Sequence, residues 1–322
     1  MNAAAGPTRR VGIDVGGTKA QGVALGLDGE LLATAHRSTP RGADSLGPLI
    51  DVLVDLAREL GEDGSVGVGV PGLVTRAGVL RAAPNLDGVA DFDVARLLSA
   101  RIGAPVEVDN DATCATVAEW QLGAAAGTDN MILVTLGTGI GGGLVANGAV
   151  QRGMNGFAGE FGHMVVDPDG PRCPCGRRGC WERYASGSGL AMLAREAATG
   201  RRLHDVVRHA GGDPQAVRGE HVQAAAREGD PEALAVIDEF ARWVALGLSN
   251  LTNALDPEMF VLGGGLAAGA DLYLDPIVHW FGELLYQPHL RPLPRVEFAT
   301  WGPLAGAVGA ALLPTLRSDH ER

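Results

Sequence analysis

Short apolar runs separated by glycine turns dominate the N-terminal part of the chain. Apolar positions cluster at 11–15 and again at 21–25, Gly16 and Gly17 stand between them, and the segment Leu27-Asp-Gly-Glu30 is typical of a tight hairpin turn. This pattern predicts three antiparallel strands within residues 10–38.

Two later segments have the period of an amphipathic helix. In residues 45–60 four leucines fall on one helical face, with Ser45 as the expected N-cap and Gly61 just past the end. Residues 231–255 show the same spacing over a longer stretch, and Asp230 is their expected N-cap. We therefore expect one medium-length and one long helix at these positions.

The strand–turn–strand pattern of the N-terminus recurs about 120 residues later. Residues 131–136 predict a strand, residues 137–143 a glycine turn and residues 144–146 another strand. Apolar runs predict further strands at 66–70, 105–108 and 259–262. A stretch of small residues at 302–313 predicts a closing helix. We interpret the repeat as a duplicated α/β half, with a domain boundary near 111–116 and the last helix returning to the first domain.

Composition narrows the class of protein. The chain has 322 residues, 46% of them hydrophobic, and no apolar run reaches the roughly 18–20 residues that span a bilayer. The first eleven residues lack the apolar stretch of a signal peptide. A net charge of −12 disfavours a nucleic-acid polymer or a membrane surface as partner. We expect a soluble cytoplasmic protein.

Glycine clusters mark candidate phosphate-binding turns. The 48 glycines include tight groups at 16–17, 141–143 and 263–265, which codon bias alone does not explain, although it suffices for the scattered ones. In the first turn, backbone N–H groups can converge on a phosphate, and a carboxylate nearby suits Mg²⁺. The nucleotide-binding candidates of this turn are Asp14, Gly16, Gly17, Thr18 and Lys19, which is the only lysine of the chain. The alternative is a plain hairpin turn.

The second and third glycine clusters follow predicted strands. Residues 137–143 match the dinucleotide pattern GxGxxG, but a strand follows them where that pattern requires a helix. A second hairpin-type phosphate turn, with Gly137, Thr138 and Gly139 as candidates, fits better. Gly263, Gly264 and Gly265 would let a nucleotide base lie against the backbone.

Asp111 and a cysteine cluster carry the remaining chemistry. Asp111 stands between a predicted strand and a predicted helix, where it is either an N-cap, a task that Asn110 could share, or a general base. The four residues His163, Cys173, Cys175 and Cys180 match a closed tetrahedral Zn²⁺ site, which would be structural, with a redox cluster as the alternative.

These residues resemble the ROK group of sugar kinases and sugar-responsive repressors, within the actin-like and hexokinase-like ATPase superfamily. The resemblance runs from Val11 to about Gly309 and is greatest to the ATP-dependent bacterial glucokinases of that group. Its motifs occur in the following order: Asp14-Val-Gly-Gly-Thr-Lys19, Pro71-Gly72-Leu73, Asn110-Asp111-Ala112, Leu136-Gly-Thr-Gly-Ile-Gly-Gly-Gly143, Glu160-Phe-Gly-His163 and Cys173-Pro-Cys-Gly-Arg-Arg-Gly-Cys180-Trp-Glu182.

The resemblance implies a two-lobed actin-like ATPase fold, ribonuclease H-like and duplicated, with a ligand cleft between its lobes. The expected small lobe comprises residues 1–112 and 301–322, and the expected large lobe comprises residues 113–300 with the zinc loop and the long helix. ATP with Mg²⁺, glucose or a similar hexose, structural Zn²⁺ and a homodimer or homotetramer are also implied.

Site roles follow by position. Asp111 falls on the family's base toward the sugar 6-hydroxyl, and Gly72 lines the sugar pocket. The implied hydroxyl-binding residues are Asn110, Glu160, His163 and Glu182. His163 also falls among the zinc ligands, so one ring nitrogen would face zinc and the other the sugar. The family varies at the position of Lys19, so the resemblance does not make this lysine essential.

Other functions remain open at this point. The hexose could be N-acetylmannosamine, N-acetylglucosamine, fructose or mannose, and polyphosphate could replace ATP as donor. A sugar-sensing repressor is disfavoured because only ten residues precede Val11 and none of them suggests a helix-turn-helix. A structural or chaperone ATPase would not need a zinc cluster beside a carboxylate-lined pocket.

Overall fold

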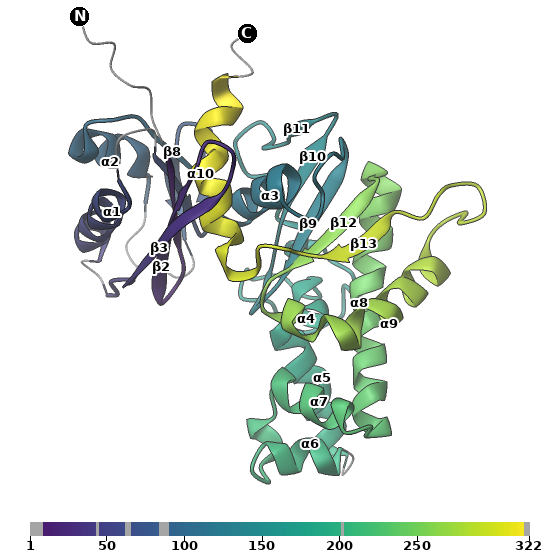
Figure 1. The fold of residues 1–322 in the computed structure, drawn as a ribbon. Helices are drawn as coiled ribbons and strands as arrows, with labels where there is room; N and C mark the ends of the chain where they lie inside the picture. Colours follow the sequence, from purple (N-terminus) through teal and green to yellow (C-terminus); the bar gives the residue numbers. More distant parts are fainter. Residues whose placement is uncertain (1–8, 43–44, 62–65, 84–89, 201–202, 319–322) are drawn as a thin grey trace, which may run out of the picture. The chain divides into compact units, whose positions relative to one another are not determined.

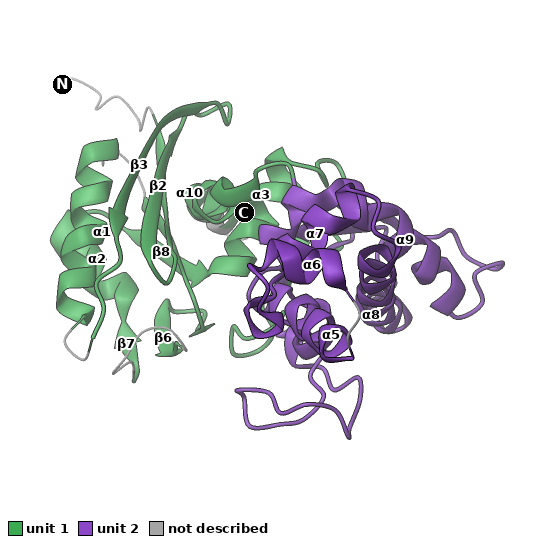
Figure 2. Ribbon diagram, turned by 90° about the horizontal axis from the view of Figure 1, so that it is seen from below, with its two compact units in different colours: residues 1–128, 143–159, 300–322 green, residues 129–142, 160–299 purple. Residues whose placement is uncertain are grey.

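A computed structural model describes residues 9–42, 45–61, 66–83, 90–200 and 203–318. Of residues 317 and 318 it describes the backbone only. Residues 1–8 of the N-terminal segment discussed above lie outside the described residues. Two compact units divide the chain, one of residues 1–128, 143–159 and 300–322, the other of residues 129–142 and 160–299 (Figure 2). We call them unit 1 and unit 2.

Unit 1 is built on a five-stranded sheet with the order β3-β2-β1-β4-β8. The three predicted N-terminal strands are confirmed: β1, β2 and β3 pair antiparallel, whereas β4 and β8 run parallel to β1. The strands are β1 (Arg10–Val15), β2 (Lys19–Leu25), β3 (Leu31–Ser38), β4 (Val66–Val70) and β8 (Val106–Asn110). A small antiparallel sheet adds β5 (Leu73–Val74), β6 (Val79–Ala82) and β7 (Phe92–Asp93).

Helices cover both faces of this sheet (Figure 1). Helices α1 (Leu46–Leu60) and α2 (Val94–Ile102) lie on one face, and α3 (Asp111–Leu122) and α10 (Ala305–Ser318) lie on the other. The leucine face of α1 is buried as predicted. Ser45 precedes α1, but the predicted side-chain cap is wrong, because its backbone is already helical and a cap needs an extended residue.

The second sheet has the order β11-β10-β9-β12-β13, which repeats the order of the first. The predicted duplication is therefore confirmed, with the 137–143 turn taking the place of the Gly16–Gly17 turn. The strands are β9 (Met131–Leu136), β10 (Ile140–Ala146), β11 (Ala149–Val150), β12 (Met259–Gly263) and β13 (Arg295–Phe298).

The long helix of unit 2 is α8 (Pro231–Leu255). Asp230 is its N-cap, as predicted, and the Asp230 side chain accepts from the N–H groups of Glu232 and Ala233. Helix α8 packs against α4, α5, α7 and α9. These helices and α6 have the bounds α4 (Glu182–Ala185), α5 (Gly187–Thr199), α6 (His204–His209), α7 (Gly219–Arg227) and α9 (Ala270–Leu284). Short 3-10 turns cover Phe161–His163, Pro214–Ala216, Gly265–Gly269 and Gly302–Leu304. None of the helices formed by the described residues is long and apolar enough to cross a membrane.

Helix α3 belongs to unit 1, because α10 lies against α3 as well as against β1 and β4. Residues 143–159 also belong to unit 1. The division expected from the sequence, with residues 1–112 and 301–322 in one lobe and 113–300 in the other, stays a prediction.

Candidate functional site

Two carboxylates lie near the carboxyl ends of β1 and β8, the two strands that flank β4 in unit 1. Asp14 lies on β1, and Asp111 is the first residue of α3, directly after β8. Gly69 on β4 stands between them: a Cβ there would lie 3.2 Å from Asp14 Oδ1 and 3.5 Å from Asp111 Cα. The parallel pairing of β1, β4 and β8 therefore places the two acids on either side of Gly69, at the same edge of the sheet.

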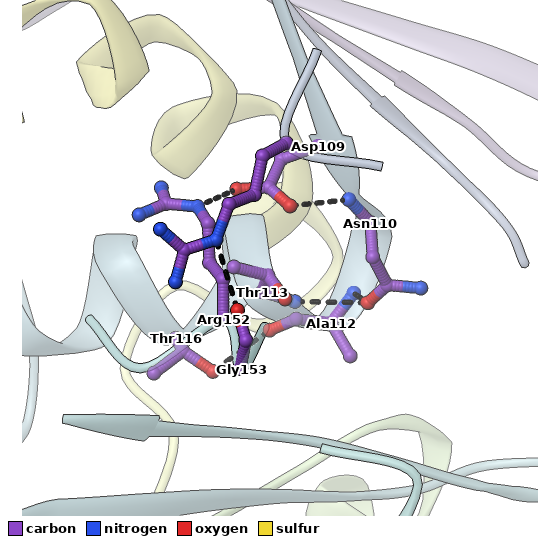
Figure 3. Close-up of polar contacts among 8 residues, drawn as sticks. Asp109, Asn110, Ala112, Thr113, Thr116, Arg152 and Gly153 are labelled. Atoms are coloured by element: carbon purple, nitrogen blue, oxygen red, sulfur yellow. Dashed lines mark hydrogen bonds and ion pairs between the residues drawn. The ribbon is translucent and has the colours of Figure 1, made fainter. Parts of the chain in front are cut away.

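The cap of α3 is Asn110, and this settles one of the alternatives for Asp111. Asn110 Oδ1 accepts from the N–H groups of Ala112 and Thr113 at 2.9 and 3.0 Å (Figure 3). Its Nδ2 donates to Gly72 O at 3.1 Å. Asp111 Oδ1 accepts from the Ala112 N–H at 2.9 Å. The helix N-terminus also stabilises the Asp111 carboxylate electrostatically.

Asp14 is the most perturbed acid of this group. Its Oδ1 is buried and has no hydrogen-bond partner among the described residues. Burial, reinforced by the charge of Asp111, raises its pKa to about 7. An oxygen in this state suits a cation, because a hard cation such as Mg²⁺ takes carboxylate oxygens as ligands.

Hydrogen bonds from beyond β3 hold the carbonyl groups of the first glycine turn. Thr39 Oγ1 donates to Gly16 O at 2.7 Å, and Arg41 Nε donates to Gly17 O at 3.1 Å. The Thr39 N–H donates to Thr18 O at 3.0 Å. Lys19 is exposed at the start of β2. The turn is therefore fixed in shape, with its lysine in solvent.

The second glycine turn meets Glu182 in unit 2. A Cβ on Gly139 would lie 2.7 Å from Glu182 Oε2, so a side chain at this position would displace the carboxylate. The Gly187 N–H, at the start of α5, donates to Gly137 O at 2.8 Å. A strand follows the turn, as expected for a phosphate turn of the hairpin type.

The other oxygen of Glu182 faces the sulfur and imidazole cluster. Glu182 Oε1 lies 3.1 Å from Cys173 Sγ and 3.8 Å from His163 Nδ1. His163 Nε2 faces the other way, 3.9 Å from Glu160 Oε2. Burial raises the pKa of the Glu160 carboxyl above its usual value; the nearby His163 ring opposes this rise, and the neighbouring Glu182 carboxylate adds to it.

The four predicted metal ligands come together. The donor atoms of His163, Cys173, Cys175 and Cys180 all lie within 4.8 Å of one another. Cys173 Sγ is 3.9 Å from His163 Nδ1, and Cys175 Sγ is 3.5 Å from Cys180 Sγ. A tetrahedral ion with bonds of about 2.3 Å requires separations of about 3.7 Å. The donors therefore fit zinc in number, type and spacing, with Nδ1 as the nitrogen on the metal side.

A cavity of about 720 Å³ lies beside the same turn within unit 2. Three of the nucleotide-binding candidates, Gly137, Thr138 and Gly265, line it, while Gly263 ends β12 and Gly264 packs against the backbone of Leu136. Its volume is in the range of nucleotide-sized ligands.

Sequence reasoning missed the arginines of this cavity. Arg183, Arg195 and Arg218 line it, and the Nε of Arg183 is buried without a partner among the described residues. Arg183 directly follows Glu182, so its place next to a motif residue was the available signal.

The comparisons with known proteins agree with this geometry. The ROK family model matches residues 10–316. The glucokinase of Streptomyces coelicolor is 39% identical, over 94% of this chain and 96% of that protein. The N-acetyl-D-glucosamine kinase of Pectobacterium atrosepticum is 35% identical, over 94% and 97%.

Among solved structures, a ROK family glucokinase from Streptomyces griseus in complex with glucose and AMPPNP superposes with a TM-score of 0.82 at 36% identity, covering 95% of this chain and 98% of that one. The chain is an α/β protein with the two-lobed actin-like ATPase plan, and it belongs to the ROK family.

The state of Asp14 leads to a prediction about stability. The pKa of Asp14 is raised from 3.8 to about 7 in the folded chain. The unfolded chain therefore releases this proton at lower pH than the folded chain, and the free energy of unfolding falls as the pH rises from about 4 to about 7. Asp14→Asn removes this loss of stability, so at pH 8, without nucleotide or Mg²⁺, the variant should be about 1–3 kcal/mol more stable than the wild type.

The gain should shrink toward pH 5, where the wild-type carboxyl is protonated in the folded chain. Thermal unfolding of both proteins across this range measures it. An identical pH dependence of the two unfolding curves would refute the assignment.

Proposed function

We propose that this protein is an ATP-dependent glucokinase, which transfers the γ-phosphoryl group of ATP to the 6-hydroxyl of glucose. The observation that carries the proposal is the position of Glu182. Its two oxygens face the Gly139 turn on one side and His163 with Cys173 on the other. Within unit 2, Glu182 therefore lies next to the candidate phosphate-binding turn, to a candidate sugar-binding side chain and to two candidate zinc ligands.

Glucose is the proposed acceptor because the donor set matches a sugar with several hydroxyls. The second Nδ2 hydrogen of Asn110 and the Nε2–H of His163 can donate to sugar hydroxyls, and the carboxylates of Glu160 and Glu182 can accept from them. A misplaced hydroxyl would leave one of these groups unpaired, which makes such a site selective among isomers. Glucokinases at 36–39% identity over 94% of the chain support glucose.

In the proposed mechanism Asp111 accepts the proton of the 6-hydroxyl as its oxygen attacks the γ-phosphorus. The bond from that phosphorus to the bridging oxygen breaks, and ADP leaves. Asp14 would hold Mg²⁺, directly or through water, and Mg²⁺ would neutralise phosphate charge. The two glycine turns, Thr18 and Lys19 are assigned to the phosphates, and Gly263–Gly265 to the nucleoside.

Besides glucose, ATP and Mg²⁺, we propose that the protein binds zinc, and that the role of the zinc is structural. Four protein ligands leave no open coordination position, so the ion would fix the loop that carries Cys173–Cys180. Gly179 shows how tightly that loop is folded, since a Cβ there would lie 1.5 Å from Asp167 O. By holding Nδ1 of His163, the ion would also leave Nε2 available to the sugar. The cytoplasmic location and the homodimer or homotetramer stay predictions.

The proposal is tested by the rate of phosphorylation of five sugars: glucose, mannose, fructose, N-acetylglucosamine and N-acetylmannosamine. We expect kcat/KM to be highest for glucose with ATP. A higher value for N-acetylglucosamine would favour the second candidate, which the 35% identity to an N-acetyl-D-glucosamine kinase supports. If none of the five is phosphorylated, the protein is not a hexose kinase.

Asp111→Asn tests the base in the same assay. General-base catalysis contributes about 10²–10⁴ in rate, so kcat should fall by that factor while KM for glucose changes less than about threefold. Folding should be intact, because Asn110 and not Asp111 caps α3. The exposed Asp55 on α1, changed to Asn, is the matched control and should retain full activity. Normal turnover by Asp111→Asn would eliminate Asp111 as base.

Metal analysis tests the zinc site. Purified protein should contain about one zinc per chain, and removal by a chelator should lower the unfolding temperature. Cys175→Ser should lose the metal, whereas Cys114→Ala, at a buried cysteine outside the cluster, should retain it. Metal-free protein that unfolds at the same temperature as the zinc-loaded form would contradict a structural role.

A further inference from the structure

A second cavity lies wholly within unit 1, lined by residues that have no role in the proposed reaction. Its volume is about 330 Å³, which is enough for a small metabolite. Strand β8, helix α3, the β10–β11 hairpin and the end of α10 contribute its walls. Trp120, Val150 and Leu313 give it an apolar part.

The polar part of the cavity is organised by an ion pair. Arg152 Nε donates to Asp109 Oδ2 at 2.6 Å, and the two side chains are only 27% and 7% exposed (Figure 3). Asp109 Oδ1 accepts from the Asn110 N–H at 2.9 Å. Both carboxylate oxygens are therefore occupied, and the carboxylate fixes the orientation of the guanidinium.

This pairing leaves part of the guanidinium unused. Among the described residues, Arg152 has no hydrogen-bond partner at its two terminal nitrogens, although both carry N–H groups. These nitrogens form the planar fork that matches a carboxylate or phosphate. A second arginine closes the site: Arg76 Nε donates to Gly153 O at 2.9 Å and so holds the chain that follows Arg152 (Figure 3).

The backbone around the cavity is built for close packing. Gly156 has φ +97°, and a Cβ there would lie 2.4 Å from Val74 O and 3.0 Å from Arg76 N. The loop 153–156 therefore lies directly against the turn after β5, and the two arginines are held from both sides. A preorganised donor loses little entropy on binding a ligand.

From these features we propose that the cavity binds a small organic anion. A carboxylate or phosphate of the ligand would lie on the free edge of Arg152, and its carbon skeleton would cover Trp120 and Val150. Inorganic anions would leave the apolar part exposed to water. Because Asp109 contacts both Arg152 and the backbone of Asn110, ligand binding is also connected to the residue that caps α3.

Calorimetric titration of the full chain tests the proposal, with glucose and a non-hydrolysable ATP analogue saturating so that the kinase site is filled. The probes are glucose 6-phosphate, phosphoenolpyruvate, citrate and inorganic phosphate. At least one organic probe should bind with a Kd of about 1 mM or tighter, and inorganic phosphate at least tenfold more weakly. Tighter binding of the phosphate esters would identify phosphate as the group bound by Arg152, and tighter binding of citrate would identify a carboxylate. Either result supports the site.

Two variants locate the binding. Arg152→Lys keeps a positive charge beside Asp109 but removes the fork, and it should weaken the Kd at least tenfold. Val150→Phe fills the cavity without touching the ion pair and should have the same effect. Arg96→Lys, at an exposed arginine paired with Asp93, is the matched control and should bind as the wild type does.

The proposal is overturned if no organic probe binds the wild type, if inorganic phosphate binds as tightly as they do, or if both cavity variants retain wild-type affinity. Because the readout is binding and not phosphorylation, failure of the proposed kinase activity would leave this test intact.

Discussion

The close approach of α10 to the sheet and to α3 is the constraint on which unit 1 depends. A Cβ on Gly309 would lie 1.6 Å from Cys114 O, one on Gly67 would lie 1.7 Å from Ala310 O, and one on Gly306 would lie 2.5 Å from the Asp14 carboxyl carbon. Any larger side chain would separate these elements. The same packing surrounds Asp14 with backbone and small side chains, which bury its Oδ1 and give it no partner.

In both units, acids lie beside a position assigned to a cation: Mg²⁺ for the proposed reaction in unit 1 and structural zinc in unit 2. In unit 1 the carboxylates of Asp14 and Asp111 raise each other's energy, and Mg²⁺ would relieve this. In unit 2 Glu160 and Glu182 lie beside His163 and the thiols, where zinc would supply the positive charge. The carboxylates that raise the pKa of Asp14 and Glu160 are thus the groups assigned to the proposed site, and perturbed pKa values are characteristic of functional sites.

Periodicity and turn chemistry predicted the elements that form around local signals. The N-terminal hairpins, α1, α8 and the duplicated sheet follow from apolar spacing, Asp230 and the glycine turns. Ser45 failed as a cap because backbone conformation, which sequence does not fix, decides whether a hydroxyl can reach the helix. Codon bias was taken as sufficient for the scattered glycines, yet Gly67 and Gly309 allow contacts across long sequence separations. The motif residues could be named from the sequence, and the place of Arg183 beside Glu182 was a signal for it as well, whereas the pairing of Arg152 with Asp109 depends on tertiary packing alone.

The central claim is that the carboxylates and turns of this chain transfer phosphate from ATP to one hydroxyl of glucose. Phosphorus NMR of the protein with glucose, ATP and Mg²⁺ tests it most directly, with 6-deoxyglucose in a parallel sample. The account predicts that ADP and a phosphate ester at carbon 6 appear in equal amounts with glucose, and that no ester forms with 6-deoxyglucose. An ester at another carbon, or ester formation from 6-deoxyglucose, would contradict it.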